Sequence, residues 1–361
     1  MKIWILLGFA FILTAYGQSM DTYIGTNHQA GTPGGIYSAR LDAGTGKWSD
    51  LKLAADTANP TFLALAPNGR TLYAAIEASP GAVQAFAVGP DRTLTFRNAQ
   101  PSGGDGTCHV SAGDGVVLVA NYRGGSGAVF PVQSDGSLAQ RSDLAVFRGS
   151  GPNAKRQQQP FGHAFESRGG FAYACDLGSD QVWAYRLEKG RLTPLDPPAG
   201  RVPPGSGPRH LAFSPDGRWV FVVNELIPGV TSFARDLETG KLQAHATRAA
   251  LPEEAMNESV TAAEIVMHPS GKWLYVSNRG HDSVTVYSVD ESGGLEVIEN
   301  RPAGVRVPRS IAIDPTGRWL VAAGQADGRL VVHAIDPATG ALALTDSVLE
   351  VPSPVCVVFA N

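Results

Sequence analysis

Apolar and polar positions alternate along this chain in short runs that recur at a nearly constant interval. Each clear copy has an alternating apolar run, a Pro-x-Gly turn and a second apolar run. Alternation with a period of two predicts β-strands, and a tight glycine turn between them predicts a hairpin. Four copies align without gaps: PTFLALAPNGRTLYAAIE from Pro60, PRHLAFSPDGRWVFVVNE from Pro208, AAEIVMHPSGKWLYVSNR from Ala262 and PRSIAIDPTGRWLVAAGQ from Pro308.

Two weaker copies, from Thr107 and Gly162, complete a regular series. The six copies then begin at positions 60, 107, 162, 208, 262 and 308, which lie 46 to 55 residues apart. Each copy continues into a third strand-like run, such as 283–290 or 329–336, and then into a turn and a fourth run. Four strands in a unit of this length are typical of a β-propeller blade.

A seventh copy is divided between the two ends of the sequence. Residues 354–360 provide one innermost strand, and the segments 22–27 and 34–42 provide further strands of the same blade. We therefore predict an all-β, seven-bladed β-propeller of four-stranded antiparallel blades, closed by N- and C-terminal strands that share one blade. Sharing a blade covers strand edges that would otherwise invite aggregation. An elongated solenoid or two stacked sandwiches would leave the divided copy unexplained.

The first residues differ from the rest of the chain. Lys2 precedes an apolar stretch from Ile3 to Leu13, and small residues follow at Ala15 and Gly17. This pattern predicts a signal peptide over residues 1–17 and a single exported domain over residues 18–361, periplasmic or secreted. An uncleaved membrane anchor is the alternative.

Composition points to a small-molecule partner. The 361 residues include 42 Gly and 25 Pro, and the net charge is -4 with no run of Lys or Arg, so we expect neither nucleic acid nor an anionic membrane as a partner. The mature chain contains no second segment that could cross a bilayer. The cysteines Cys108, Cys175 and Cys356 lie in apolar runs without metal-ligand spacing, which predicts buried thiols.

Ionisable residues recur at two positions of the repeat. Equivalent positions of successive blades surround the central channel, so these residues are expected to converge although they are distant in sequence. One set begins the innermost strands: Cys108, His109, His163, Arg209, His210, Glu264 and Arg309. The other set follows the second strands: Glu77, Asn121, Tyr122, Glu225, Arg279 and Gln325.

Arginines, glutamates and histidines around one channel predict an anion pocket with an acid/base group. Opening a lactone requires an attacking water, a stabilised oxyanion and a protonated leaving alkoxide. We expect Glu225 or Glu264 as the base, His163 as its acid/base partner, and Arg209 and Arg279 as anion and oxyanion binders. The further residues expected to bind substrate are His109, Asn121, His210 and Gln325.

Other chemistries lack their local signals. The chain contains no GxSxG elbow, and the glycines of YRGGSG are not followed by the GK[ST] of a phosphate loop. His109, His163 and His210 could converge, but their spacing is not that of a metal site. We therefore predict no metal and no cofactor.

These stretches together resemble the lactonase family of seven-bladed β-propellers, which includes the 6-phosphogluconolactonases and the carboxymuconate cyclases. The resemblance rests on YIGTN, CHVS, VANYRGGS, DLGSDQV and the four ungapped copies, and it covers the mature chain nearly end to end. It implies a lactone hydrolase whose active residues match His163, Arg209, Glu225 and Arg279. The family usually has Pro-His-x-His where this sequence has Gly162-His163-Ala164-Phe165.

Three functions remain open at this point. The first is a 6-phosphogluconolactonase-like enzyme that opens a sugar lactone, phosphorylated or not, to the aldonic acid. The second is a non-catalytic propeller of the envelope that binds a related anion. The third is a muconate-type cycloisomerase that closes a lactone with the same residues.

Overall fold

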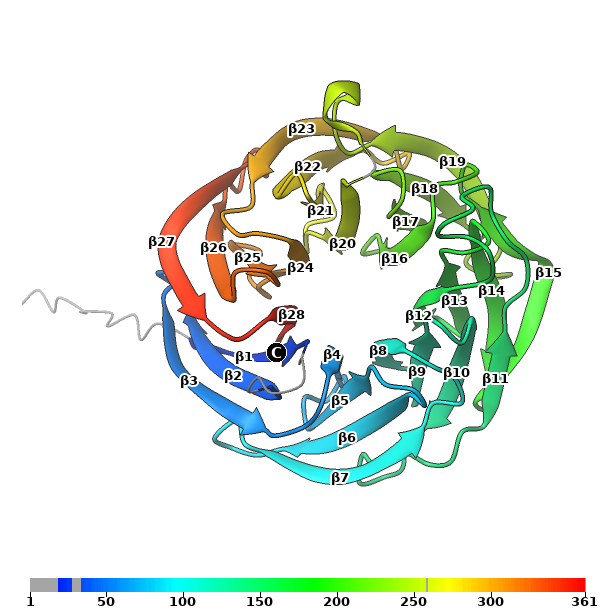
Figure 1. The fold of residues 1–361 in the computed structure, drawn as a ribbon, viewed down its shortest axis with the longest axis horizontal. Coiled ribbons are helices and arrows are strands. Elements are labelled where there is room, and N and C mark those ends of the chain that lie inside the picture. Colours follow the sequence, from blue (N-terminus) through cyan, green and yellow to red (C-terminus); the bar gives the residue numbers. More distant parts are fainter. Residues whose placement is uncertain (1–18, 28–33, 258, 361) are drawn as a thin grey trace, which may run out of the picture.

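A computed structural model describes residues 19–27, 34–257 and 259–360. These residues form seven four-stranded antiparallel sheets arranged around a central channel, as Figure 1 shows in a view along the ring axis. The predicted seven-bladed β-propeller is therefore confirmed. The predicted signal peptide over residues 1–17 lies outside the described residues.

Each blade runs outward from an innermost strand, and the blades follow one another around the ring (Figure 1). The described chain also has one short 3-10 helix, Glu253–Ala255, and no helix long and apolar enough to span a membrane. From the innermost strand outward, the blade shared by the two ends consists of β28 (Pro354–Phe359), β1 (Ser19–Thr26), β2 (Ile36–Asp42) and β3 (Trp48–Ala55). The next three blades along the chain are β4 (Pro60–Leu65), β5 (Thr71–Ile76), β6 (Ala82–Val88) and β7 (Leu94–Pro101); β8 (Thr107–Gly113), β9 (Val116–Asn121), β10 (Ser126–Pro131) and β11 (Asp143–Val146); and β12 (Gly162–Arg168), β13 (Phe171–Asp176), β14 (Gln181–Glu188) and β15 (Arg191–Arg201). The last three are β16 (Pro208–Phe213), β17 (Trp219–Asn224), β18 (Gly229–Arg235) and β19 (Leu242–Ala249); β20 (Thr261–Met267), β21 (Trp273–Arg279), β22 (Ser283–Val289) and β23 (Leu295–Pro302); and β24 (Pro308–Ile313), β25 (Trp319–Gly324), β26 (Arg329–Ile335) and β27 (Leu342–Glu350).

One blade is built from both ends of the described chain. The innermost strand β28 pairs antiparallel with β1, with Thr22 opposite Phe359 and Gly25 opposite Cys356. Backbone hydrogen bonds of this pair join the two ends of the described chain in one blade and so close the ring, as the divided repeat predicts. The cysteines Cys108, Cys175 and Cys356 are free and buried.

The pairing of every innermost strand shifts register near its first residue. In β12, Gly162 faces Asp176 and Ala164 already faces Cys175, which leaves His163 outside the ladder. Such a bulge re-aims a side chain that regular pleating would hold in the sheet. The same shift occurs in the other six blades, where the residues passed over are Thr61, Cys108, Arg209 with His210, Ala263 with Glu264, Arg309 and Val355.

Neighbouring blades interlock through aromatic rings that pack on glycines. An aromatic residue at the start of a second strand faces the glycine of the outer turn in the next blade. A Cβ added to Gly340 would lie 2.4 Å from the Trp273 ring, and one added to Gly293 would lie 2.3 Å from the Trp219 ring. The indole Nε1 of Trp219 also donates to the carbonyl of Glu291 in that turn, at 3.3 Å.

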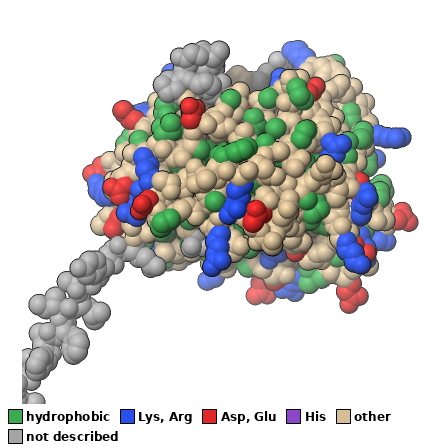
Figure 2. Space-filling view, turned by 90° about the horizontal axis from the view of Figure 1, so that it is seen from below, with side chains coloured by type: hydrophobic (Ala, Val, Ile, Leu, Met, Phe, Trp, Pro, Cys, Tyr) green, Lys and Arg blue, Asp and Glu red, His purple; other side chains and the backbone are tan. Residues whose placement is uncertain are grey.

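The outer face of the ring carries charges of both signs. Figure 2 shows one flank of the ring, where basic and acidic side chains are interspersed rather than gathered by sign. The outermost strands are the most exposed parts of the blades, as in β19 and β3. Several ionisable groups gather instead on the channel side and are buried there, among them His163, Arg209, Glu225 and Glu264, which directs attention to the ring centre.

The packing of aromatic rings on glycines predicts that replacing two glycines of the same backbone conformation by alanine will cost different amounts of stability. Gly69 (φ +67°) has nothing within 4 Å of an added Cβ, whereas Gly340 (φ +74°) faces Trp273. We expect Gly69→Ala to cost about 1 kcal/mol through backbone strain alone, and Gly340→Ala to cost roughly 1–3 kcal/mol more because the indole must move. Thermal melts of the two variants measure this difference, and equal melting temperatures would contradict the interlock.

Candidate active site

A polar cavity of about 270 Å³ lies where the innermost strands begin, at one end of the channel. Its walls come from six blades and from the loop that precedes β12. It is far more polar than a typical ligand pocket, which suits a charged substrate. The lining residues are Glu77, Cys108, Tyr122, Arg156, His163, Glu225, Thr261, Arg279 and Arg309.

Two structural positions supply nearly all of these side chains. Cys108, His163 and Arg309 are the bulge residues of β8, β12 and β24, so their side chains leave the ladder and reach the channel. Glu77 and Glu225 directly follow the second strands β5 and β17. The two positions singled out from the repeat therefore meet at the same end of the ring.

The Glu225 carboxylate is the centre of the cavity's charge network. Its Oε1 lies 2.8 Å from Nη2 of Arg156 and 3.3 Å from Nη2 of Arg279. Its Oε2 lies 3.1 Å from Nε of Arg209 and 3.7 Å from Nε2 of His163. Only 5% of the Glu225 side chain is exposed, so these pairs are screened little by solvent.

The network shifts both titrating groups at the centre of the site. Burial would raise the pKa of Glu225, but the surrounding cations, led by Arg279, outweigh it and hold the pKa far below its ordinary 4.5. Burial and the nearby Arg209 charge lower the pKa of His163 well below its ordinary 6.5. At neutral pH the site thus holds an ionised carboxylate beside a neutral imidazole.

Two charged groups of the cavity remain without a partner of opposite sign. Among the described residues, no carboxylate lies within ion-pair distance of Arg309, although its guanidinium lines the cavity. Oε2 of Glu77 is buried and makes no hydrogen bond in the described part of the chain. With Arg156, Arg279 and Arg309 against Glu77 and Glu225, the lining carries three positive and two negative formal charges.

The structure brings together His163, Arg209, Glu225 and Arg279 of the predicted catalytic set. Arg209 lies behind the lining, where its Nη1 donates to the carbonyl of Ala263 at 2.6 Å. Glu264 is not in this cavity. Together with His109 and His210 it lines a second chamber at the other end of the channel; these three stand one residue later in their copies than Cys108, His163 and Arg309 do.

Two predicted binding residues lie elsewhere. Asn121 is fully buried inside its blade, where its side chain accepts from Oγ1 of Thr107 and donates to Oγ of Ser126. Gln325 lines a separate pocket on the rim beside Asp327. Neither side chain contacts the Glu225 network.

Phe165 marks the departure from the family's usual histidine, and it lies away from the cavity. Its ring is fully buried in a hydrophobic cluster between blades and packs near Tyr185 and Gly127. His163, the histidine that lines the cavity, lies at the bulge of β12. The substitution therefore changes the packing between blades and leaves the lining of the cavity unaltered.

Arg156 is the site residue that the repeat does not reveal. It lies in the loop between β11 and β12, outside every copy, and its Nη2 also approaches the Tyr122 hydroxyl at 3.2 Å. The one sign of this loop in the sequence is the long interval, 55 residues, between the copies that begin at Thr107 and Gly162. Tyr122, Glu77 and Arg309 did carry the repeat signal.

The three channel histidines do converge. The ring centroids of His163 and His210 lie 5.0 Å apart, and those of His109 and His210 lie 5.3 Å apart. Within the described ranges, no group of three His, Cys, Asp or Glu side chains is placed to hold a metal ion. Aromatic packing against Phe62, 4.4 Å from the His109 ring centroid, accounts for part of this cluster.

Removing the Glu225 charge should destabilise the fold in a pH-dependent way. A carboxyl whose pKa is lower in the folded than in the unfolded chain stabilises the fold above its unfolded pKa, and that stabilisation is lost as pH falls. We expect Glu225→Gln to cost about 3–5 kcal/mol near neutral pH, because three guanidiniums lose their counter-charge.

The cost of Glu225→Gln should stay constant above the ordinary pKa of 4.5 and shrink below it, as the unfolded wild-type chain takes up the proton. Thermal melts of wild type and variant at several pH values measure this. The exposed pair Arg186–Glu188, broken by Glu188→Gln, serves as the control that should cost little. A stability difference that is the same at low and neutral pH would contradict the assignment.

Comparison with known proteins agrees with this architecture. A family described as "Lactonase, 7-bladed beta-propeller" matches residues 21–359. A 6-phosphogluconolactonase of Bacillus subtilis is 38% identical over 346 residues, covering 94% of this chain and 98% of the relative. A 6-phosphogluconolactonase of Formosa agariphila is 31% identical, covering 80% of this chain and 84% of the relative.

A solved structure gives the same result. The periplasmic gluconolactonase of Pseudomonas aeruginosa superimposes with a TM-score of 0.89 at 31% identity, covering 95% of this chain and 99% of that one. Similarity at this level extends over whole chains rather than over an isolated blade. The chain therefore belongs to the lactonase family of seven-bladed β-propellers, enzymes of the carboxylic-ester hydrolase class.

Proposed function

We propose that this protein hydrolyses a sugar lactone to the corresponding aldonic acid in the cavity around Glu225. The observation that carries the proposal is the buried imidazole of His163, 3.7 Å from the Glu225 carboxylate, in a cavity lined by guanidinium groups. Hydrolysis of a lactone needs a base for water and positive charge for the oxyanion. Relatives named 6-phosphogluconolactonase and gluconolactonase support this substrate class.

We assign the general base to His163 rather than to Glu225. Both groups have lowered pKa values, but Glu225 is paired with three guanidinium groups that oppose its protonation. His163 instead lies beside a carboxylate that favours its protonation. His163 would remove a proton from water as the water oxygen attacks the lactone carbonyl. Glu225, 3.7 Å from Nε2, would stabilise the imidazolium that forms.

The arginines complete the proposed cycle. The guanidinium group of Arg279 would hold the negative charge that develops on the carbonyl oxygen, and Arg309 would be left to bind the anionic part of a substrate. When the tetrahedral intermediate collapses, the bond to the ring oxygen breaks and the His163 imidazolium returns its proton to the leaving alkoxide. The products are an open-chain hydroxy acid and the neutral imidazole, so one water is consumed per ring opened.

Glu264 has a different place in this scheme from the one expected from sequence. It lies in the other chamber and is bonded to His210, so it does not face a substrate held beside His163. Glu77 offers a second carboxylate within the cavity, and its unbonded Oε2 makes it the alternative base to be tested beside His163.

Export of the protein is part of the proposal. Its support is the sequence of residues 1–17 and the likeness to a gluconolactonase whose description calls it periplasmic. An exported enzyme would meet unphosphorylated sugar lactones more readily than a phosphorylated metabolic intermediate. N-terminal sequencing of the purified mature protein checks for cleavage after Gly17.

Replacing His163 should remove most of the catalysed rate. We expect His163→Gln to lower kcat by about 10²–10⁴-fold with a smaller change in KM, because the base is lost and the arginines remain. A pH-stat measures acid release from glucono-δ-lactone and from freshly prepared 6-phosphogluconolactone, corrected for spontaneous hydrolysis. His245→Gln, an exposed histidine on β19, is the matched control.

The pH profile separates His163 from Glu77. Because burial lowers the pKa of His163, its neutral form persists below 6.5, so kcat/KM should stay level from neutral pH to below that value and fall only in more acidic solution. Full activity in His163→Gln and loss in Glu77→Gln would transfer the base to Glu77. No catalysis by the wild type on either lactone would favour a binding propeller.

Arg309 should recognise the anionic part of a substrate. Its guanidinium is the one in the cavity lining without a carboxylate partner among the described residues. We expect Arg309→Gln to raise KM for 6-phosphogluconolactone by roughly 10-fold or more through loss of charged hydrogen bonds. The effect on KM for glucono-δ-lactone should be small, and equal effects on both lactones would assign Arg309 to the oxyanion alone.

A further inference from the structure

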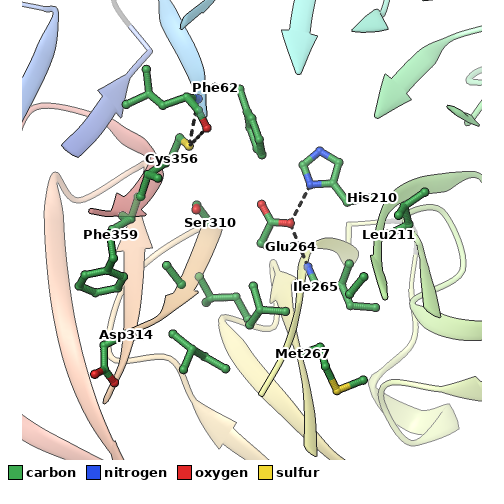
Figure 3. A pocket seen from close by; sticks show the side chains of 18 of the residues that line it. Phe62, His210, Leu211, Glu264, Ile265, Met267, Ser310, Asp314, Cys356 and Phe359 are labelled. Atoms are coloured by element: carbon green, nitrogen blue, oxygen red, sulfur yellow. Dashed lines mark hydrogen bonds and ion pairs between the residues drawn. The ribbon is translucent and has the colours of Figure 1, made fainter. Parts of the chain in front are cut away.

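The channel has a second chamber, at the end opposite the Glu225 cavity. It measures about 440 Å³ and follows the later residues of the innermost strands, whereas the first cavity lies at their beginnings. Figure 3 shows the chamber, with Glu264 and His210 on one side and Phe62 and Cys356 on another. Its volume suffices for a small organic molecule.

The two cavities are separated by buried polar side chains. Arg209 is 2% exposed and contacts Glu225 on one side and the carbonyl of Ala263 on the other. His210 lies next to it, with its ring centroid 5.0 Å from that of His163. A molecule in the second chamber would therefore not touch the carboxylate assigned to the reaction.

Glu264 gives the second chamber a polar anchor. Its Oε1 pairs with Nδ1 of His210 at 2.7 Å and accepts from the backbone N–H of Ile265 at 3.1 Å. The other oxygen takes part in neither bond and points into the chamber (Figure 3). Glu264 is only 7% exposed, so a ligand group that meets this oxygen would do so with little competition from water.

The charges of the two cavities are opposite. The residues that line the second chamber include the carboxylates of Glu166, Glu264 and Asp314 but no Lys or Arg, whereas three arginines line the first cavity. Asp314 is occupied by backbone N–H groups of its own turn, at 2.6 Å from Trp319 and 2.8 Å from Arg318. Glu166 lies 3.6 Å from Nε2 of His109, which leaves the second oxygen of Glu264 to meet a ligand of positive charge.

The walls around Glu264 are apolar and partly aromatic. Phe62 stacks on His109, and aliphatic side chains from β16, β20 and β24 continue the surface toward the open end. An apolar body with a single cationic group would match both the walls and the carboxylate. The apolar residues that form most of the lining are Leu63, Leu211, Ile265, Val266, Ile311 and Ile313.

We propose that this chamber is a second ligand site, which takes a small organic ammonium compound by pairing its cation with Glu264 and burying its apolar part against Phe62 and the aliphatic walls. The site is independent of the proposed lactonase reaction. It assigns a role to a buried carboxylate that the reaction does not use. The ring would thus bind anionic groups at one end of the channel and cationic groups at the other.

Affinity for the ammonium compound should depend on pH. Burial raises the pKa of Glu264 to about 7, so the carboxyl gains its charge as pH rises through neutrality. An ammonium probe should therefore bind more tightly at pH 8 than at pH 6, since it stays protonated over this range. The other charged or titratable groups that act on Glu264 are His109, His210, Arg209 and Arg309.

Three probes of one shape test the proposal: benzylammonium, benzyl alcohol and benzoate. Isothermal titration or ligand-observed NMR with the mature chain should give benzylammonium a Kd on the order of 1 mM, as expected for a fragment of this size. Benzyl alcohol should bind at least tenfold more weakly. Benzoate should be excluded from this chamber. Any binding of benzoate in the Glu225 cavity should be the same in the wild type and in Glu264→Gln.

Variants place the binding in the chamber. Glu264→Gln keeps the shape and should weaken benzylammonium binding at least tenfold, whereas Glu77→Gln, a carboxylate of the first cavity, should leave it unchanged. Glu264→Asp keeps the charge and serves if the glutamine variant does not fold. Equal binding of benzylammonium and benzyl alcohol, unchanged binding in Glu264→Gln, or no binding at all would overturn the proposal, whatever the lactonase assay gives.

Discussion

The start of every innermost strand departs from regular pairing, and the chemistry of the ring depends on that departure. A regular strand would alternate its side chains between the two faces of its own blade. The bulge leaves one or two residues without a ladder partner, and in five of the seven blades these include an ionisable group. One backbone irregularity, repeated, thus brings ionisable side chains from distant segments to the channel.

Closure of the ring holds these positions in place. Because β28 and β1 complete one blade, every innermost strand has neighbours on both sides, and the bulges of distant segments stand at one height around the axis. The bulge of β16 holds two residues, which reach both ends of the channel. Arg209 reaches Glu225 at one end of the channel, while His210, its neighbour in sequence, reaches Glu264 at the other.

The repeat was sufficient to predict the fold, the divided blade and most of the first cavity, because period and register are local properties of the sequence. Grouping both positions as one set hid the two ends of the channel: His109, His210 and Glu264 are the third residues of their copies and line the second chamber, whereas His163 is the second residue of its copy and lines the first cavity. Asn121 carries the right register but satisfies its amide within the blade. Arg156 could not be predicted, because its loop belongs to no copy and only the folded ring brings it to Glu225.

The Glu225 network has a consequence for how this sequence can change over time. Four segments, including the loop of Arg156 and strands β12, β16 and β21, depend on one buried carboxylate for their charge balance. Loss of one member alters the effect of losing any other, so their contributions are not additive. We expect these positions to covary among homologues as a group, with strong epistasis, even though more than a hundred residues separate the first from the last.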